Sequence, residues 1–188
     1  MNIEVEIKIE IDNFDEIKQK VAKRGKLIRS INQIDEYYIP CQRDFFAAKP
    51  HPFEWLRIRT NPDKTIFEYD LSINKDATGR QECAEEYETG ITDPIEFRKI
   101  LKFLDFKKVV EVNKQRQYWD CGEIEIALDQ VKKLGDFIEA EAKGDFKSTA
   151  EARTACIKFL EDLGFSDIDH KEILVGYPVL YIERNTQK

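Results

Sequence analysis

The stretch Ile3-Glu4-Val5-Glu6-Ile7-Lys8-Ile9-Glu10-Ile11 alternates aliphatic and charged side chains without interruption. Alternation with period two places every aliphatic side chain on one face of a β-strand and every charged side chain on the other. A strand whose charged face meets water would explain this pattern by itself. The other segments of the chain decide whether the charged face has a further role.

Two other segments carry charge in the same alternating way. Phe137-Ile138-Glu139-Ala140-Glu141-Ala142-Lys143 repeats the Glu-x-Glu spacing, and Leu56-Arg57-Ile58-Arg59 places two guanidinium groups on one strand face. Paired carboxylates and paired cations on neighbouring strands predict a β-barrel with a charged interior. Such an interior is suited to metal ions and a polyphosphate.

The composition favours one domain over residues 1–188 and excludes several classes of protein. The formal charge is −7 and charged residues make up 36% of the chain, but both signs are mixed, so there is no basic stripe for nucleic acid. No apolar run is long enough to span a membrane, and the N-terminus lacks the core of a signal peptide. We therefore expect a cytoplasmic protein with no nucleic-acid or membrane partner.

The cysteines and histidines exclude further kinds of site. The four cysteines form no Cys-x-x-Cys pair, and only two histidines occur, His51 and His170. This set argues against a structural zinc site, a disulfide scaffold and histidine-based nucleophilic catalysis. The chemistry must rest on carboxylates, lysines and arginines.

Hydrophobic periodicity and capping residues predict three helices among antiparallel strands. The first is capped by Asp12 or Asn13 and ends at Gly25, and the third begins at a capping box of Ser148 and Glu151. The second begins at Asp93-Pro94, with an apolar stripe of Phe97, Ile100, Leu101 and Leu104 expected to face the core. The tail around Pro178 reads as a short helix or an edge segment. The expected strands are residues 3–11, 27–39, 55–60, 65–73, 83–89, 107–119, 123–130 and the segment after Gly135.

The carboxylates of these strands form a candidate metal site. Several carboxylates packed together repel one another and raise their own pKa values unless a cation neutralises them. Oxygen ligands without histidine or thiolate favour Mg²⁺ or Mn²⁺. The alternative is that they are ordinary outward-facing strand residues. The expected metal ligands are Glu4, Glu6, Asp129, Glu139 and Glu141.

The cations form a candidate phosphate site. Guanidinium groups match phosphate oxygens with two hydrogen bonds, and lysine adds a mobile charge. The alternative is cross-strand salt bridging with the glutamates. The expected phosphate-binding residues are Lys8, Arg57, Arg59, Lys114 and Arg116.

In this order and phase, the segments resemble the CYTH superfamily, named for class IV adenylyl cyclases and thiamine triphosphatases. The resemblance rests on Glu4-x-Glu6-x-Lys8, on Leu56-Arg57-Ile58-Arg59, and on the run from Lys114-x-Arg116 through Ala127-Leu128-Asp129 to Leu134-Gly135-x-Phe137-x-Glu139-x-Glu141. It implies an α+β fold, a closed antiparallel eight-stranded β-barrel called a triphosphate tunnel, with helices packed on the outside.

The resemblance also implies roles for individual residues. It assigns the five acidic positions to divalent metals and the five basic positions to phosphates, and it makes Lys8, Lys114 and Asp129 the expected catalytic residues. The segment containing Arg43-Asp44-Phe45 is similar to the class IV cyclase branch, and Arg43 and Lys75 are further expected phosphate contacts. Members convert ATP to cyclic AMP and pyrophosphate, or hydrolyse thiamine triphosphate or tripolyphosphate.

The sequence departs from the family pattern at three places. Asp70 stands where the family usually has a lysine, Ala84 where it usually has an arginine, and Val175-Gly176-Tyr177 where a lysine-serine-tyrosine pattern is usual. We expect a metal-dependent adenylate cyclase, with a triphosphatase as the alternative. A non-catalytic polyphosphate or nucleotide binder is the rival that these departures favour, and a homodimer is an expectation from the resemblance.

Overall fold

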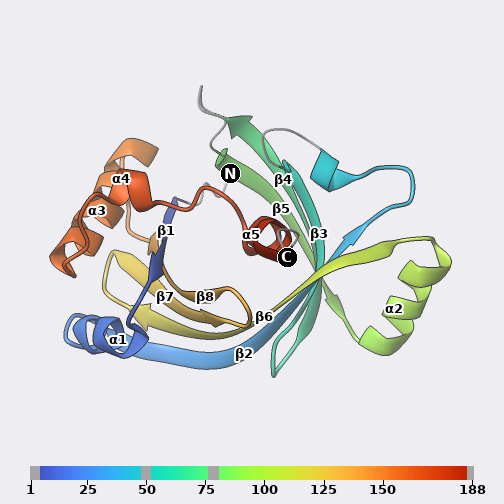
Figure 1. Ribbon diagram of the computed structural model, residues 1–188, viewed down its shortest axis with the longest axis horizontal. Coiled ribbons are helices and arrows are strands. Elements are labelled where there is room, and N and C mark those ends of the chain that lie inside the picture. Colours follow the sequence, from blue (N-terminus) through green and yellow to red (C-terminus); the bar gives the residue numbers. More distant parts are fainter. Residues whose placement is uncertain (1–4, 48–51, 76–80, 186–188) are drawn as a thin grey trace. The chain divides into compact units, whose positions relative to one another are not determined.

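The computed structural model describes the backbone of residues 5–47, 52–75 and 81–185, and the side chains of these residues except 72–75 and 81–84. Its elements form an α+β fold of one antiparallel sheet with helices (Figure 1). The strands are β1 (Glu6–Ile11), β2 (Lys26–Ile39), β3 (Glu54–Thr60), β4 (Thr65–Lys75), β5 (Gln81–Ile91), β6 (Lys107–Asp120), β7 (Ile124–Val131) and β8 (Gly135–Ala142). The helices are α1 (Phe14–Ala22), the 3-10 helix η1 (Phe45–Ala47), α2 (Pro94–Phe103), α3 (Thr149–Asp162), α4 (Ile168–Lys171) and α5 (Tyr177–Asn185).

The eight strands follow the order β1-β8-β7-β6-β2-β3-β4-β5 in the sheet. Within the described ranges no hydrogen-bonded ladder joins β1 to β5, the two strands at the ends of this order. The eight-stranded antiparallel sheet is therefore as expected, whereas its closure into a barrel stays a prediction.

The chain divides into two compact units. Among the described residues, unit 1 comprises residues 32–47, 52–75, 81–113 and 175–185, and unit 2 comprises residues 5–31 and 114–174. The long strands β2 and β6 each contribute residues to both units. The single domain expected over residues 1–188 stays a prediction.

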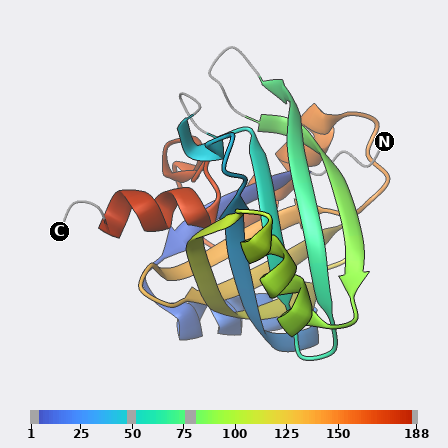
Figure 2. The ribbon, with the colours of Figure 1, turned by 90° about the vertical axis from the view of Figure 1, so that its right-hand side faces the viewer.

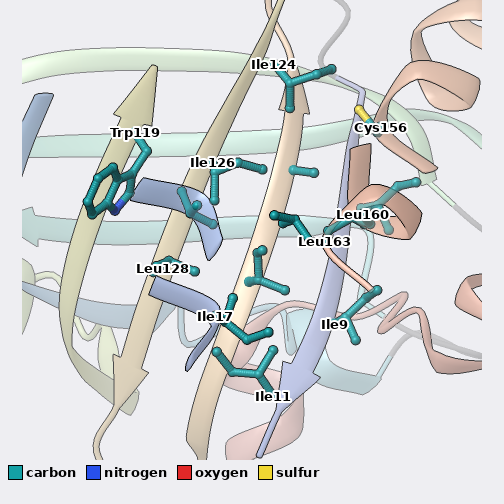
Figure 3. Close-up of a cluster of buried hydrophobic side chains, with 14 of the residues drawn as sticks. Ile9, Ile11, Ile17, Trp119, Ile124, Ile126, Leu128, Cys156, Leu160 and Leu163 are labelled. Atoms are coloured by element: carbon teal, nitrogen blue, oxygen red, sulfur yellow. The ribbon is translucent and has the colours of Figure 1, made fainter. Parts of the chain in front are cut away.

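Unit 2 buries the aliphatic face of the N-terminal strand. Ile7, Ile9 and Ile11 are at most 6% exposed, as the alternation of β1 predicts. Helix α3 contacts β1, β7 and β8, and α1 contacts β7. Figure 3 shows Ile9 of β1 in the same buried cluster as Leu160 of α3 and Leu163, which caps the C-terminal end of that helix. The apolar face of this part of the sheet is thus covered by amphipathic helices.

Local signals in the sequence set the helix ends of unit 2. The side chain of Asn13 accepts a hydrogen bond from the backbone N–H of Glu16, and Ser148 accepts one from Glu151, so both predicted caps are confirmed. The expected end of α1 at Gly25 is wrong, because the helix already ends at Ala22. A Cβ atom at Gly25 would lie 2.3 Å from the Cys121 sulfur, so this glycine permits close contact with the turn after β6.

Unit 1 has its own apolar cluster between α2 and the strands β2 and β3. The cluster contains Tyr38, Leu56, Ile58 and Leu101, all at most 8% exposed. Figure 2 shows α2 lying over β3, in agreement with this packing. The helix begins at the predicted cap, since the side chain of Asp93 accepts hydrogen bonds from two backbone N–H groups of the first turn.

The predicted core stripe of α2 is only partly correct. Phe97 packs against Phe67 with ring centroids 4.8 Å apart, and Leu101 is buried, but Ile100 and Leu104 are 52% and 60% exposed. Successive helical residues are about 100° apart, so the line through Phe97 and Leu101 differs from the line through Ile100 and Leu104. The helix contacts the sheet along the first line only.

The ambiguous tail forms a helix, α5, which begins at Tyr177 with Pro178 in its first turn. A proline is tolerated there because the first N–H groups of a helix have no partner within the helix. None of the described helices is both long and apolar enough to cross a membrane.

A substitution in the unit 2 core should separate buried from exposed leucines. We expect Leu160→Ala to lower the free energy of unfolding by about 2–5 kcal/mol, because it removes a fully buried side chain and leaves a cavity. The matched control Leu174→Ala, at a position 50% exposed, should cost markedly less. Urea denaturation measures both, and equal losses would contradict the packing described.

The buried thiol of Cys156 should make stability fall at alkaline pH. Burial, with the nearby charges of Glu141 and Glu6, raises the pKa of Cys156 from 9.0 to about 12. Between these values the unfolded chain loses a proton that the folded chain keeps, so stability falls as pH rises, by about 1.4 kcal/mol per pH unit.

Denaturation between pH 8 and 11 tests this expectation. The Cys156→Ala variant should show a shallower loss of stability than the wild type, although its stability at pH 7 is lower. The Cys41→Ala variant, which removes an exposed thiol, is the control for the loss of a thiol as such. Parallel curves for wild type and Cys156→Ala would refute the assignment.

Candidate functional site

Four charged residues on one face of the unit 2 strands are buried. Lys8, Lys114, Asp129 and Glu139 are all at most 7% exposed. Charged side chains are almost never fully buried unless they are paired. The reading of these strands as having an ordinary water-facing charged side is therefore wrong for these four residues.

Strand register brings these residues together. Lys8 of β1 lies directly opposite Glu139 of β8, and Arg116 of β6 lies opposite Asp129 of β7. Residues opposite each other in an antiparallel ladder share a face, with their Cβ atoms about 5 Å apart. We call the set Glu6, Lys8, Lys114, Arg116, Asp129 and Glu139 the unit 2 cluster.

Ion pairs link the whole unit 2 cluster. Lys8 Nζ lies 3.2 Å from Glu139 Oε1 and 3.8 Å from Glu6 Oε1, and Lys114 Nζ lies 3.9 Å from Asp129 Oδ2. Arg116 donates from Nε to Asp129 Oδ1 at 2.6 Å, and from Nη2 to both Asp129 and Glu139. Arg116 therefore bridges two buried carboxylates.

These contacts set the protonation states of the unit 2 cluster. Burial opposes ionisation of Glu139, but the Arg116 and Lys8 cations outweigh it and hold the pKa of Glu139 well below its usual range. Burial likewise opposes the charge on Lys8, but Glu139 and Glu6 raise its pKa. Removal from water and the charge of Glu139 raise the pKa of Glu6.

Two of the predicted metal ligands, Glu6 and Glu141, lie at the edge of this cluster. Glu141 lies opposite Glu6 in the ladder and pairs with Lys143. The side chain of Glu141 is 21% exposed and that of Glu6 is 48% exposed, so these two carboxylates are more accessible than those of Asp129 and Glu139. Glu4 lies outside the described residues. The all-oxygen donor set is of the kind that suits Mg²⁺ or Mn²⁺.

The predicted arginine pair lies in unit 1, within a second charged cluster. Arg59 donates to Asp35 from Nε at 2.8 Å and from Nη2 at 3.4 Å, and its Nη1 lies 3.4 Å from Glu68 Oε2. Arg57 donates from Nη1 to the Tyr37 hydroxyl at 3.3 Å, and its Nη2 pairs with Glu68 and, at 3.4 Å, with Asp70. We call Asp35, Arg57, Arg59, Glu68, Asp70 and Glu86 the unit 1 cluster.

The carboxylates of the unit 1 cluster include a group that our sequence analysis did not assign to a site. Single oxygens of Glu68, Asp70 and Glu86 lie within 4.8 Å of one another, close enough for the three carboxylates to hold one metal ion. The signal was present as Glu68-x-Asp70, an acidic i, i+2 pair on the strand that follows Arg57-x-Arg59. Its pairing with the arginines depends on register, which a single segment does not reveal.

Two further predicted phosphate contacts have different outcomes. Arg43 is 56% exposed and pairs with Glu54 at 3.1 Å, while its guanidinium lies 5.0 Å from the ring centroid of Phe45. Its recorded partners are therefore loop and strand-end residues, not the arginine pair. Lys75 is the last residue of β4, and its side chain is not described. Each cluster belongs to one unit, and a single channel lined by both stays a prediction.

Comparison with known proteins identifies the family. A "putative adenylate cyclase" of Methanocaldococcus jannaschii is 36% identical over 141 residues, which cover 74% of this chain and 76% of the relative. A solved structure from Pyrococcus horikoshii has a TM-score of 0.77 at 31% identity, covering 96% of this chain and 99% of that one. A Hippeastrum structure, reported to reveal a dominant triphosphatase activity, has a TM-score of 0.66 at 14% identity, with 99% and 96% coverage.

The last comparison supports the fold alone, because its sequence identity is low. The family itself is identified over nearly the whole chain, since residues 2–172 match the CYTH domain. The buried charged strands described above are the segments on which the sequence resemblance rested. This chain therefore belongs to the CYTH domain family.

Proposed function

We propose that this protein is a Mg²⁺- or Mn²⁺-dependent enzyme that converts ATP to cyclic AMP and pyrophosphate. Members of the family are adenylate cyclases or triphosphatases, and the relative from Methanocaldococcus jannaschii bears an adenylate cyclase name. The observation that carries the proposal is the unit 2 cluster. Three cations, Lys8, Lys114 and Arg116, are held beside carboxylates on the buried charged side of the strands.

The internal ion pairs supply a route to substrate binding by exchange of partners. A linear triphosphate brings about four negative charges, and its metal ion brings two positive ones. If a metal ion were held by the carboxylates, Lys8 and Arg116 would be able to donate to phosphate oxygens instead. Each buried charge then keeps an opposite charge beside it, which avoids the cost of an unpaired buried ion.

The residues of the cluster take separate roles in this scheme. The metal would be held by Glu4, Glu6, Asp129, Glu139 and Glu141, and when bound it supplies charge stabilisation to the reacting phosphate. Lys8 acts as a fixed positive charge on a phosphate oxygen, because its raised pKa keeps it protonated and unsuited to accept a proton. Arg116 presents a planar fork that fixes the phosphate chain in line for attack by the ribose 3′-hydroxyl.

Hydrolysis of a triphosphate is the second candidate function. It uses the same cations and carboxylates, with water in place of the ribose hydroxyl and attack on the terminal phosphorus. Membership of a family that includes triphosphatases supports this candidate, and thiamine triphosphate and tripolyphosphate are the further substrates to examine.

A binder without turnover is the third candidate, and the unit 1 cluster supports it. Arg57 and Arg59 already pair with carboxylates of the same unit, and Asp70 occupies a position where the family has a cation. We further propose that the strands close into the tunnel typical of the family. The cytoplasmic location, the homodimer and the lack of a nucleic-acid partner stay predictions.

Product analysis tests the proposal directly. Purified protein is incubated with ATP, thiamine triphosphate or tripolyphosphate in Mg²⁺ or Mn²⁺, and the products are separated by chromatography. We expect cyclic AMP and pyrophosphate from ATP. Orthophosphate as the main product would replace the cyclase with a triphosphatase, and tight binding without any product would replace both with a binder.

A double variant tests the role of the carboxylates in β8. Glu139→Gln with Glu141→Gln should lower metal-dependent turnover by about 100-fold or more, because it removes two oxygen ligands and the partners of Lys8 and Arg116. The matched control is Glu10→Gln with Glu123→Gln, which changes the formal charge equally at two exposed positions. Full turnover in the first variant would refute the metal assignment.

A further inference from the structure

The carboxylates of the unit 1 cluster outnumber the cations that reach them among the described residues. Arg59 makes its two-point contact with Asp35 and lies only 3.4 Å from one oxygen of Glu68. Arg57 is the cation shared by Glu68 and Asp70. Glu86 makes no ion pair within the described part of the chain. The group Glu68, Asp70 and Glu86 thus carries excess negative charge.

Two oxygens of this group are buried without a hydrogen-bond partner. Glu68 and Asp70 are 1% and 6% exposed, and Glu68 Oε2 and Asp70 Oδ1 accept no hydrogen bond in the described structure. Buried carboxylate oxygens normally accept hydrogen bonds, and those that do not point to a missing partner. Water would satisfy the oxygens as acceptors but would leave the excess charge, whereas a cation satisfies both.

Strand geometry brings the three carboxylates to one place. Asp70 of β4 lies directly opposite Glu86 of β5, and Glu68 is two residues away on the same face of β4. The two strands lie side by side along the edge of the sheet (Figure 2). Because Glu86 is exposed while the other two are buried, the group offers both enclosed ligands and an accessible one for an entering ion.

We propose that Glu68, Asp70 and Glu86 form a second divalent-cation site, separate from the ligands expected on β1, β7 and β8. The three carboxylates supply oxygen ligands of the kind taken by Mg²⁺, Mn²⁺ or Ca²⁺. Binding would neutralise the excess charge and weaken the hold of Glu68 and Asp70 on Arg57.

The consequence of this site is local to the arginine pair. An ion that takes oxygens from Glu68 and Asp70 leaves the Nη2 group of Arg57 with fewer internal acceptors, while Tyr37 still holds Nη1. The guanidinium is then available to an external anion without leaving two buried carboxylates unpaired. The cation site stands independently of the reaction proposed above, since it requires no triphosphate.

Direct binding of Mn²⁺ to the metal-free protein tests the site without any substrate. Titration is followed by calorimetry and by loss of the free Mn²⁺ electron paramagnetic resonance signal. Asp70→Asn keeps the shape of the side chain and removes its charge. This variant should bind one Mn²⁺ ion fewer than wild type, or bind that ion at least tenfold more weakly. Glu86→Gln, at an exposed position that folding does not require, should weaken binding of the same ion.

Two comparisons make the result specific. Glu85→Gln removes the same charge from the opposite face of β5, so it should leave Mn²⁺ binding as in wild type. The Glu139→Gln, Glu141→Gln variant should keep the Mn²⁺ ion that Asp70→Asn loses. Circular dichroism verifies folding of each variant. Equal Mn²⁺ stoichiometry and affinity in wild type, Asp70→Asn and Glu86→Gln would overturn the proposal. It would also be overturned if the Glu139→Gln, Glu141→Gln variant lost the same Mn²⁺ ion as Asp70→Asn.

Discussion

The contact of Arg116 with Asp129 and Glu139 is the interaction on which the charged side of unit 2 depends. Both carboxylates are buried, and an ionised carboxylate in a low-dielectric interior is costly unless a cation and hydrogen bonds compensate it. The planar guanidinium reaches both at once, which a lysine at this position would not do. Without that bridge, Glu139 would depend on Lys8, and Asp129 on Lys114 at 3.9 Å, for a compensating positive charge.

The two clusters follow the same principle with different balances of charge. In unit 2 each carboxylate of the cluster has a lysine or arginine partner, and the pKa values of Lys8 and Glu139 shift toward their charged forms. In unit 1 the carboxylates exceed the cations near them, and burial raises the pKa of Asp70 in spite of Arg57 and Arg59. The first balance suits the exchange of partners that we propose for unit 2, and the second suits the cation site that we propose for unit 1.

Much of the fold follows from local patterns in the sequence. The alternation in residues 3–11 predicts the aliphatic face that α3 covers, and Asn13, Asp93 and Ser148 act as the helix caps that their positions predict. These features depend on neighbours within a few residues, so a single sequence contains the information. Helix α2 marks the limit: its stripe is apolar, but the line of contact with the sheet is set by packing, which leaves Ile100 and Leu104 exposed.

The candidate sites were predictable to the extent that they repeat a spacing. Lys8, Arg116, Asp129 and Glu139 were identified because Glu-x-Glu and the basic pairs recur in one phase, and the structure brings them together. The partners of Arg57 and Arg59 were not identified, because Asp35 and Glu68 meet the arginines only through the registers of β2 with β3 and β3 with β4. Register is a long-range property, and an isolated acidic residue on a strand gives no sign of it.

Asp70 shows how one such residue changes the chemistry of a whole strand face. A lysine at this position would add a third cation beside Arg57 and Arg59, which would still pair with Glu68 and Asp35. The Oδ2 atom of the aspartate instead lies 3.4 Å from Nη2 of Arg57, and Asp70 lies opposite Glu86 in the ladder. The local charge is therefore negative where a lysine would make it positive. The excess negative charge at this face repels an anion. On our proposal, a positive ion at this face would therefore precede, or arrive together with, any phosphate bound by Arg57.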